Sequence, residues 1–173
     1  MIDSASKTWL VSGLLVAASI LAGCSMGGDS SRSRHGHTKK DVECMERAIF
    51  FEANRSSRQG MIAVGTVVMN RVASDEFPNT VCGVVGQKNQ FAPGVMTRPM
   101  NSKALPDVQE AARAVLNGER QPGVRNARFF HTAGYSFPYN NMHYVLVAGG
   151  NAFYEKRKKH LVTQRVPPAP IDR

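Results

Sequence analysis

The sequence is poor in acidic residues, in charged residues generally and in cysteine. It has 13 Asp and Glu, 22 Lys and Arg and three Cys among 173 residues, with a formal net charge of +9. Charged residues make up 20% and apolar residues 42%, so the chain can bury an ordinary core and is not wholly disordered. The 15 Gly and 9 Pro follow no period, which excludes collagen-like chains. The length suits one domain with appended sequence, and the positive charge predicts an anionic partner: nucleic acid, membrane surface or bacterial cell wall.

The N-terminal apolar stretch, residues 10–21, is too short to span a bilayer comfortably. Lys7 precedes it and Leu-Ala-Gly-Cys follows at 21–24, so it is typical of a secretory signal. The tetrapeptide resembles the bacterial lipobox, in which the cysteine is lipidated after cleavage. We therefore expect residues 1–23 to be a lipoprotein signal peptide and Cys24 to carry a membrane anchor, the alternative being an ordinary signal peptide or an uncleaved anchor. Ser25, directly after the cysteine, resembles the sorting signal of outer-membrane lipoproteins. This resemblance implies a cell-envelope protein on the outer membrane, facing the periplasm.

Composition divides the rest of the chain. Residues 24–40 contain too few hydrophobic residues to order themselves, so we expect a flexible tether. The folded, catalytic domain is expected at 41–160, and residues 161–173 are expected to be a Pro-rich tail.

Hydrophobic periodicity within residues 41–160 predicts three helices. The segment 107–117 is amphipathic, with Pro106 and Gly118 suited to opening and closing a helix. The segment 58–72 is apolar on nearly every side, which places it in the middle of the domain. The first helix is expected to end near residue 54. The later segments 127–131 and 143–148 are β-rich and predict a hairpin with a long loop.

Glu52 is the candidate catalytic residue. It occupies the next position on the apolar stripe of Met45, Ala48 and Ile49, whereas Glu43 and Glu46 are expected on solvated faces. A carboxyl group on a buried face has a raised pKa and keeps its proton near neutral pH, as a general acid must. The alternative is a structural ion pair with Arg71, Arg55 or another base.

Five blocks resemble the cell wall hydrolase family of bacterial spore-cortex-lytic enzymes and appear in that family's order. They are 48–53 (AIFFEA), 60–72 (GMIAVGTVVMNRV), 77–85 (FPNTVCGVV), Gln90-Phe91 and 150–154 (GNAFY). The resemblance implies a mainly helical α+β, lysozyme-like single domain with a small β-hairpin. It also implies peptidoglycan as the partner and substrate, cleavage of the glycan strand, and Glu52 as the single catalytic glutamate.

The sequence also departs from that family. The family usually continues its glutamate as Glu-Ala-Arg-Gly-Glu, whereas Ser56 stands here at the second acid position. A hydrolytic muramidase generally needs a second carboxylate, and Asp75, Glu76, Asp107 and Glu110 have no clear context for that role. A lytic transglycosylase needs only one acid, so this is the favoured activity. Hydrolysis by a muramidase and non-catalytic binding of peptidoglycan by a lipid-tethered protein are the alternatives.

Polar and aromatic residues of the matching blocks and the segment between them are candidates for substrate binding. They are Gln90, Phe91, His131, Tyr135, Asn151 and Tyr154, and core packing is the alternative for each aromatic ring.

Cysteine and histidine content complete the expectations. Cys44 and Cys82 form an even pair in an exported chain and predict a disulfide, with two unpaired thiols as the alternative. His131, His143 and His160 lack the spacing of a zinc amidase, so no metal and no other cofactor is expected. Export and the absence of a basic recognition helix argue against nucleic acid as a partner.

Overall fold

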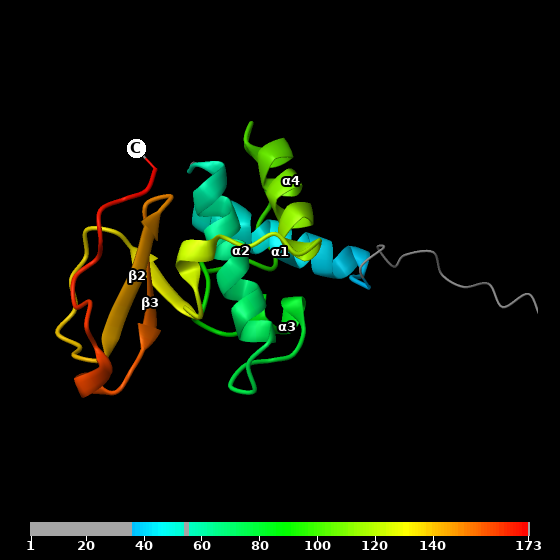
Figure 1. Cartoon of the computed structure of the whole chain (residues 1–173). Helices are drawn as coiled ribbons and strands as arrows, with labels where there is room; N and C mark the ends of the chain where they lie inside the picture. The colour runs from blue at the N-terminus through cyan, green and yellow to red at the C-terminus, as the bar shows by residue number, and fades with distance from the viewer. Residues whose placement is uncertain (1–35, 54–55, 173) are drawn as a thin grey trace, which may run out of the picture.

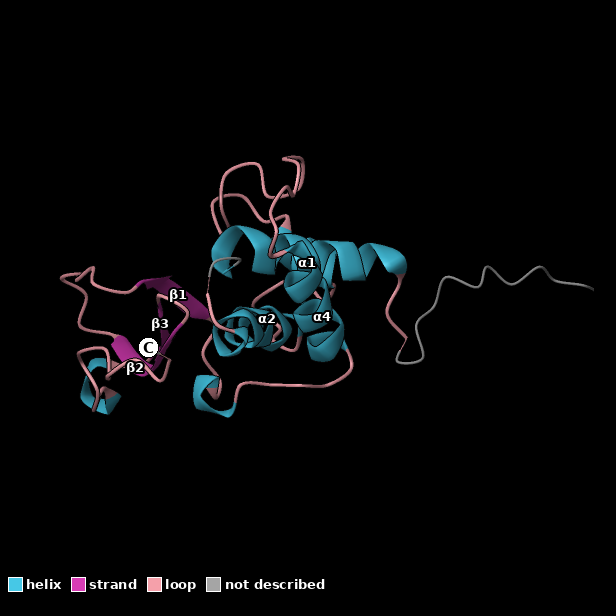
Figure 2. Cartoon of the chain, turned by 90° about the horizontal axis from the view of Figure 1, so that it is seen from above, coloured by secondary structure: helices cyan, strands magenta, loops and turns pink. Residues whose placement is uncertain are grey.

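The computed structural model describes residues 36–53 and 56–172. The predicted signal peptide 1–23, Cys24 and most of the tether 24–40 lie outside the described residues. Four α-helices gather on one side of the molecule and a small antiparallel sheet lies on the other (Figures 1 and 2). The predicted mainly helical α+β class is therefore confirmed.

The elements follow one another along the chain in the order helices, sheet, C-terminal segment. Their bounds are α1 Lys39–Ala53, α2 Arg58–Val72, α3 Val81–Val85, α4 Leu105–Leu116, β1 Phe129–Thr132, β2 Met142–Ala148 and β3 Asn151–Lys156, with 3-10 turns η1 Pro122–Val124 and η2 Lys159–Leu161.

Helix α2 lies at the centre of the helical part and packs against α1, α3 and α4. It occupies the predicted residues 58–72, and the Ser57 side chain caps it by accepting a hydrogen bond from the Gly60 N–H. Gly60 also allows α2 to approach the turn between β2 and β3, because a Cβ there would lie 2.5 Å from the Gly149 Cα. The start of α2 is thereby fixed against the sheet.

Helix α4 matches the predicted amphipathic segment within two residues. It begins at Leu105 because Pro106 fits the first helical turn, and it ends before Gly118, whose φ of 104° suits glycine. None of the helices in the described part of the chain is long and apolar enough to cross a membrane.

Helix α1 starts two residues before the expected boundary at residue 41. The Thr38 hydroxyl accepts a hydrogen bond from the Asp41 N–H, and Asp41 Oδ2 accepts one from the Thr38 N–H, which is a reciprocal cap. The expectation that Glu46 is solvated was wrong. Its side chain is 8% exposed because this face of α1 packs against α4, where it bonds to Gln109.

The sheet has the order β1-β3-β2, and both pairings are antiparallel. The small hairpin is therefore formed by β2 and β3, which turn at Gly149 and Gly150 with φ of 57° and 76°. The expected hairpin between the segments 127–131 and 143–148 was wrong, because β3 inserts between these two strands. Phe130 and Phe153 face the helices on one side of the sheet, and their rings pack 5.7 Å apart.

The fold continues past residue 160, where the sequence analysis expects it to end. The C-terminal segment runs along the outer side of the sheet (Figure 1). The Ile171 N–H donates to the Val147 carbonyl, and the Gly149 N–H donates to Asp172 at 2.8 Å. These bonds cover the free edge of β2, which would otherwise expose unpaired backbone groups.

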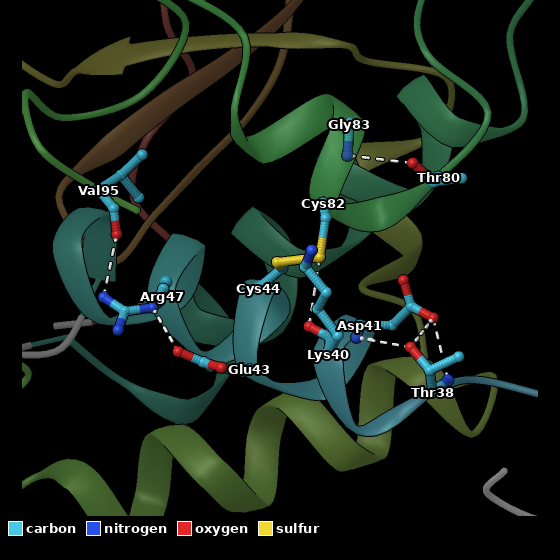
Figure 3. The surroundings of a disulfide bond; sticks show 10 residues. All are labelled: Thr38, Lys40, Asp41, Glu43, Cys44, Arg47, Thr80, Cys82, Gly83 and Val95. Carbon is cyan, nitrogen blue, oxygen red and sulfur yellow. Dashed lines mark hydrogen bonds and ion pairs between the residues drawn. A yellow bond between two sulfur atoms is a disulfide. The ribbon is translucent and has the colours of Figure 1, made fainter. Parts of the chain in front are cut away.

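The predicted disulfide between Cys44 and Cys82 is formed and joins α1 to α3 (Figure 3). It closes a loop with a sequence separation of 38 residues. In the chain-entropy account, a loop of this length stabilises the fold by about 4 kcal/mol.

Replacing both cysteines, Cys44→Ser with Cys82→Ser, should lower the free energy of unfolding by about 4 kcal/mol, because the unfolded chain regains its loop entropy. Urea unfolding followed by circular dichroism measures the change. The reductant dithiothreitol should destabilise the wild type to the same extent and leave the double variant unaffected. An unchanged midpoint in the double variant would contradict this account.

Candidate active site

Glu52 lies in the last turn of α1 and is half-buried. Its side chain lines a cavity of about 570 Å³. The lining residues are Phe50, Phe51, Glu52, Ala53, Ser56, Arg98, Pro99, Asn101, Ser102 and Gly149. Glu52 is the one carboxylic acid among these described lining residues. The predicted inward-facing carboxyl group thus stands beside open space.

Two contacts from distant parts of the chain hold Glu52. The Ala92 N–H donates a hydrogen bond of 2.7 Å to the carboxylate oxygen Oε1. Asn151, at the start of β3, donates from Nδ2 to the Glu52 backbone carbonyl at 3.1 Å. Asn151 is 7% exposed and its amide satisfies the end of α1. This contact gives Asn151 a positioning role beside its predicted role in substrate binding.

Arg71 supplies a buried positive charge near this carboxyl group. It is 3% exposed, its Nε donates to the Arg128 carbonyl at 2.7 Å, and its Nη1 has no hydrogen-bond partner among the described residues. Three aromatic rings surround its guanidinium carbon at 5.1 to 5.8 Å, a cation–π arrangement. They belong to Phe77, Phe91 and Phe129.

Glu52 forms no ion pair with the described bases. The alternative of a structural ion pair with Arg71 is therefore not what the structure contains, and Arg55 lies outside the described residues.

Burial is the main influence on both charged groups. It raises the pKa of Glu52, while the hydrogen bond from Ala92 and the charge of Arg71 act in the opposite direction. Burial lowers the pKa of Arg71 to about 10, although Tyr154 and Glu52 favour its charged form. Glu52 therefore holds its proton more firmly than an exposed glutamate, as the sequence predicts for a general acid.

The predicted pair Gln90 and Phe91 is split by the structure. Gln90 is exposed, whereas Phe91 is buried in the core, with its ring 6.4 Å from that of Phe130 and 5.2 Å from the guanidinium carbon of Arg71. This burial and these contacts match the core packing that is the alternative for each aromatic ring. The Phe91 ring packs against the guanidinium group of Arg71.

The remaining predicted binding residues lie on or beside the other face of the sheet. His131 is half-buried, its Nε2 lies 2.9 Å from the Tyr144 hydroxyl, and its ring lies 5.8 Å from that of Tyr154. Tyr154 stacks on Phe129, and burial raises the pKa of its phenol. Tyr135 is 67% exposed in the loop between β1 and β2. None of these three lines the cavity of Glu52 within the described residues.

The candidates for a second acid do not reach this cavity. Asp75 and Asp107 are exposed, Glu76 pairs with Arg128, and Glu110 pairs with Arg58. In the described part of the chain, no three His, Cys, Asp or Glu side chains form a group that could hold a metal ion.

Sequence reasoning missed two residues of this site. From the sequence, Arg71 is only a possible ion-pair partner of Glu52, whereas the fold buries it among three aromatic rings. Arg98 follows no motif, and its place beside Glu52 emerges only from the fold.

Comparison with known proteins identifies a family and a fold. The family described as Cell Wall Hydrolase matches residues 55–154, a stretch that begins just after Glu52. The catalytic domain of the SleB protein of Bacillus cereus is 24% identical, with a TM-score of 0.59, and the match covers 75% of this chain and 99% of that domain. The catalytic domain of the germination-specific lytic transglycosylase SleB of Bacillus anthracis is 23% identical, with a TM-score of 0.58, over 69% of this chain and 98% of that domain. These likenesses confirm the lysozyme-like fold.

Curated relatives match part of the chain. The spore cortex-lytic enzyme of Oceanobacillus iheyensis is 33% identical over 95 residues, which are 53% of this chain and 33% of that enzyme. The spore cortex-lytic enzyme of Bacillus cereus is 37% identical over 57 residues, which are 33% of this chain and 22% of that enzyme. The chain thus spans about a third or less of the length of these two relatives.

The titration of Glu52 tests the electrostatics of the site. In the wild type, NMR of the side-chain carboxyl carbon should give a pKa above the ordinary glutamate value, because burial disfavours the charged form. Arg71→Gln should raise this pKa further, since the positive charge that favours the carboxylate is lost. Arg71→Lys should restore part of the difference.

Folding of the Arg71 variants is checked by the dispersion of their amide spectra. A Glu52 pKa at or below the ordinary value in the wild type would contradict the effect of burial. A lower pKa in Arg71→Gln would contradict the effect of the Arg71 charge.

Proposed function

Because this chain belongs to the Cell Wall Hydrolase family, we propose that it cleaves the glycan strand of peptidoglycan as a lytic transglycosylase. The bond cut is the one between N-acetylmuramic acid and N-acetylglucosamine. The observation that carries the proposal is a single half-buried carboxylic acid beside a cavity of about 570 Å³.

A lone acid suits transglycosylation because the same group can act twice. Protonated Glu52 gives its proton to the glycosidic oxygen, and the bond from that oxygen to C1 of the muramic acid breaks. The Glu52 carboxylate then takes the proton of the C6 hydroxyl of the same muramic acid, while the oxygen of that hydroxyl forms a bond to C1. The products are a 1,6-anhydro sugar and a free hydroxyl on the leaving sugar, and Glu52 recovers its proton.

Two features of the site support both halves of this cycle. Burial of Glu52 favours the protonated acid before the first step. The Ala92 N–H at 2.7 Å and the nearby charge of Arg71 stabilise the carboxylate that exists between the steps. A hydrolytic glycosidase would place a second carboxyl group about 5 to 9.5 Å from the first, and no second acid lines the cavity among the described residues.

The place of action is part of the proposal. The apolar stretch and Leu-Ala-Gly-Cys at 21–24 support export and lipid attachment at Cys24. We place the domain on the outer membrane, facing the periplasm, where peptidoglycan is within reach of a tethered enzyme.

Glu52→Gln should reduce the release of fragments from purified peptidoglycan by about 10²- to 10⁴-fold, the usual share of acid–base catalysis. The amide keeps the size of the side chain and an oxygen that accepts the Ala92 N–H, so the fold should survive. Mass spectrometry of the soluble fragments gives both the rate and the chemistry. Wild-type fragments should end in 1,6-anhydromuramic acid.

The matched control is Glu46→Gln, which neutralises the other buried glutamate of α1 away from the cavity. It should retain activity. Reducing ends would replace the proposal with hydrolysis by a muramidase, and free stem peptides would replace it with amidase action. No release by the wild type would favour a non-catalytic peptidoglycan binder.

A further inference from the structure

The cavity beside Glu52 has a second charged wall that the proposed chemistry does not use. The segment 98–102 contributes Arg98, Pro99, Asn101 and Ser102 to the lining. Arg98 is the one base among the described lining residues, just as Glu52 is the one acid. A cavity that binds only neutral sugar hydroxyls has no need of a cation at this position.

Three contacts hold the Arg98 side chain in place. Its guanidinium carbon lies 4.6 Å from the centre of the Phe51 ring, next to Glu52 in the chain. Its Nη1 donates to the Pro93 carbonyl at 3.2 Å. Gly94, with a φ of 72°, leaves room for the stem, because a Cβ there would lie 2.9 Å from the Arg98 Cγ and Cδ. The guanidinium is therefore pre-organised, which lowers the entropic cost of binding a ligand.

The backbone around Arg98 is anchored to the helix that carries Glu52. Arg47 on α1 donates from Nη1 to the Arg98 carbonyl at 2.9 Å and to the Val95 carbonyl at 3.3 Å (Figure 3 shows the bond to Val95). Six residues before Arg98 in the chain, the Ala92 N–H donates a hydrogen bond to the Glu52 carboxylate. The acid and the base of the cavity thus belong to one rigid unit.

The unused donors of Arg98 define the ligand. Arg98 is exposed and forms no ion pair with the described acids. Its remaining N–H groups form a planar fork, whose best partner is a carboxylate bound through both oxygens. The Asn101 amide, which has no hydrogen bond to the described residues, adds a neutral donor and acceptor on the same wall.

We propose that Arg98 forms a carboxylate-binding subsite next to Glu52, which holds an acidic group of the substrate while the glycan is cut. The inference rests on the proposed function for its ligand, because peptidoglycan carries carboxylates on its stem peptides and, where a stem peptide is missing, on the lactyl group. A substrate bound this way places its muramic acid, which bears these groups, beside the acid that cuts at its C1. The subsite determines specificity and takes no part in proton transfer.

Binding to uncleaved strands tests the subsite separately from the chemistry. The full chain carrying Glu52→Gln is titrated with solubilised glycan strands that bear stem peptides, and with the same strands after conversion of their carboxylates to methylamides. The methylamide strands should bind roughly 10- to 100-fold more weakly, the usual effect of losing a hydrogen-bonded charge. Adding Arg98→Gln should abolish this difference, and Arg98→Lys should restore part of it.

Lys103→Gln is the matched control, since Lys103 is an exposed base on the same segment outside the cavity. It should leave the preference for carboxylates unchanged. Strands stripped of stem peptides carry free lactyl carboxylates and identify the source of the charge: a preference that persists shows that the subsite also accepts the lactyl carboxylate, and a lost one assigns the peptide alone. An equal effect of Lys103→Gln and Arg98→Gln, or a preference that survives Arg98→Gln, overturns the subsite. Failure of the wild type to cleave peptidoglycan would overturn only the proposed function.

Discussion

The site depends on how the C-terminal end of α1 is held. The last turn of a helix leaves backbone carbonyls without partners, and Asn151 satisfies the one at Glu52. The Ala92 N–H then fixes the carboxylate of the same residue. One contact comes from the sheet and the other from an irregular segment, so the Glu52 carboxyl group is held in place only when both parts of the domain are assembled.

The charge of Arg71 explains why so much aromatic surface gathers beside the helix. A buried guanidinium with an unpartnered Nη1 is costly, and such a group needs a reason to persist. Three rings and the Arg128 carbonyl offset part of this cost. The charge of Arg71 lowers the pKa of Glu52 from a distance, without a direct ion pair. The Glu52 carboxyl group can therefore still take up a proton.

Sequence patterns predicted the parts of the molecule in which local preference and burial agree. Residues 58–72 are apolar on nearly every side and form the central helix, and the predicted pair Cys44 and Cys82 forms the disulfide. The errors have a common cause. The burial of Glu46 and the place of β3 in the sheet depend on which neighbours the fold supplies, and periodicity along one segment does not contain that information. The C-terminal segment likewise is a Pro-rich tail by composition and joins the fold because it exchanges backbone hydrogen bonds with the edge of β2.

The segment between α3 and α4 shows why the site could be predicted only in part. It has no regular secondary structure, yet it supplies the N–H that holds Glu52, the ring that supports Arg71 and the base that faces the cavity. Its conformation is maintained by single polar contacts to α1, chiefly those of Arg47. Helices with strong periodicity therefore provide a rigid frame, while residues with weak sequence signals hold Glu52 and line the cavity beside it. Substrate preference can change in this segment without disturbing the core, because a loop anchored at a few points tolerates substitution between them.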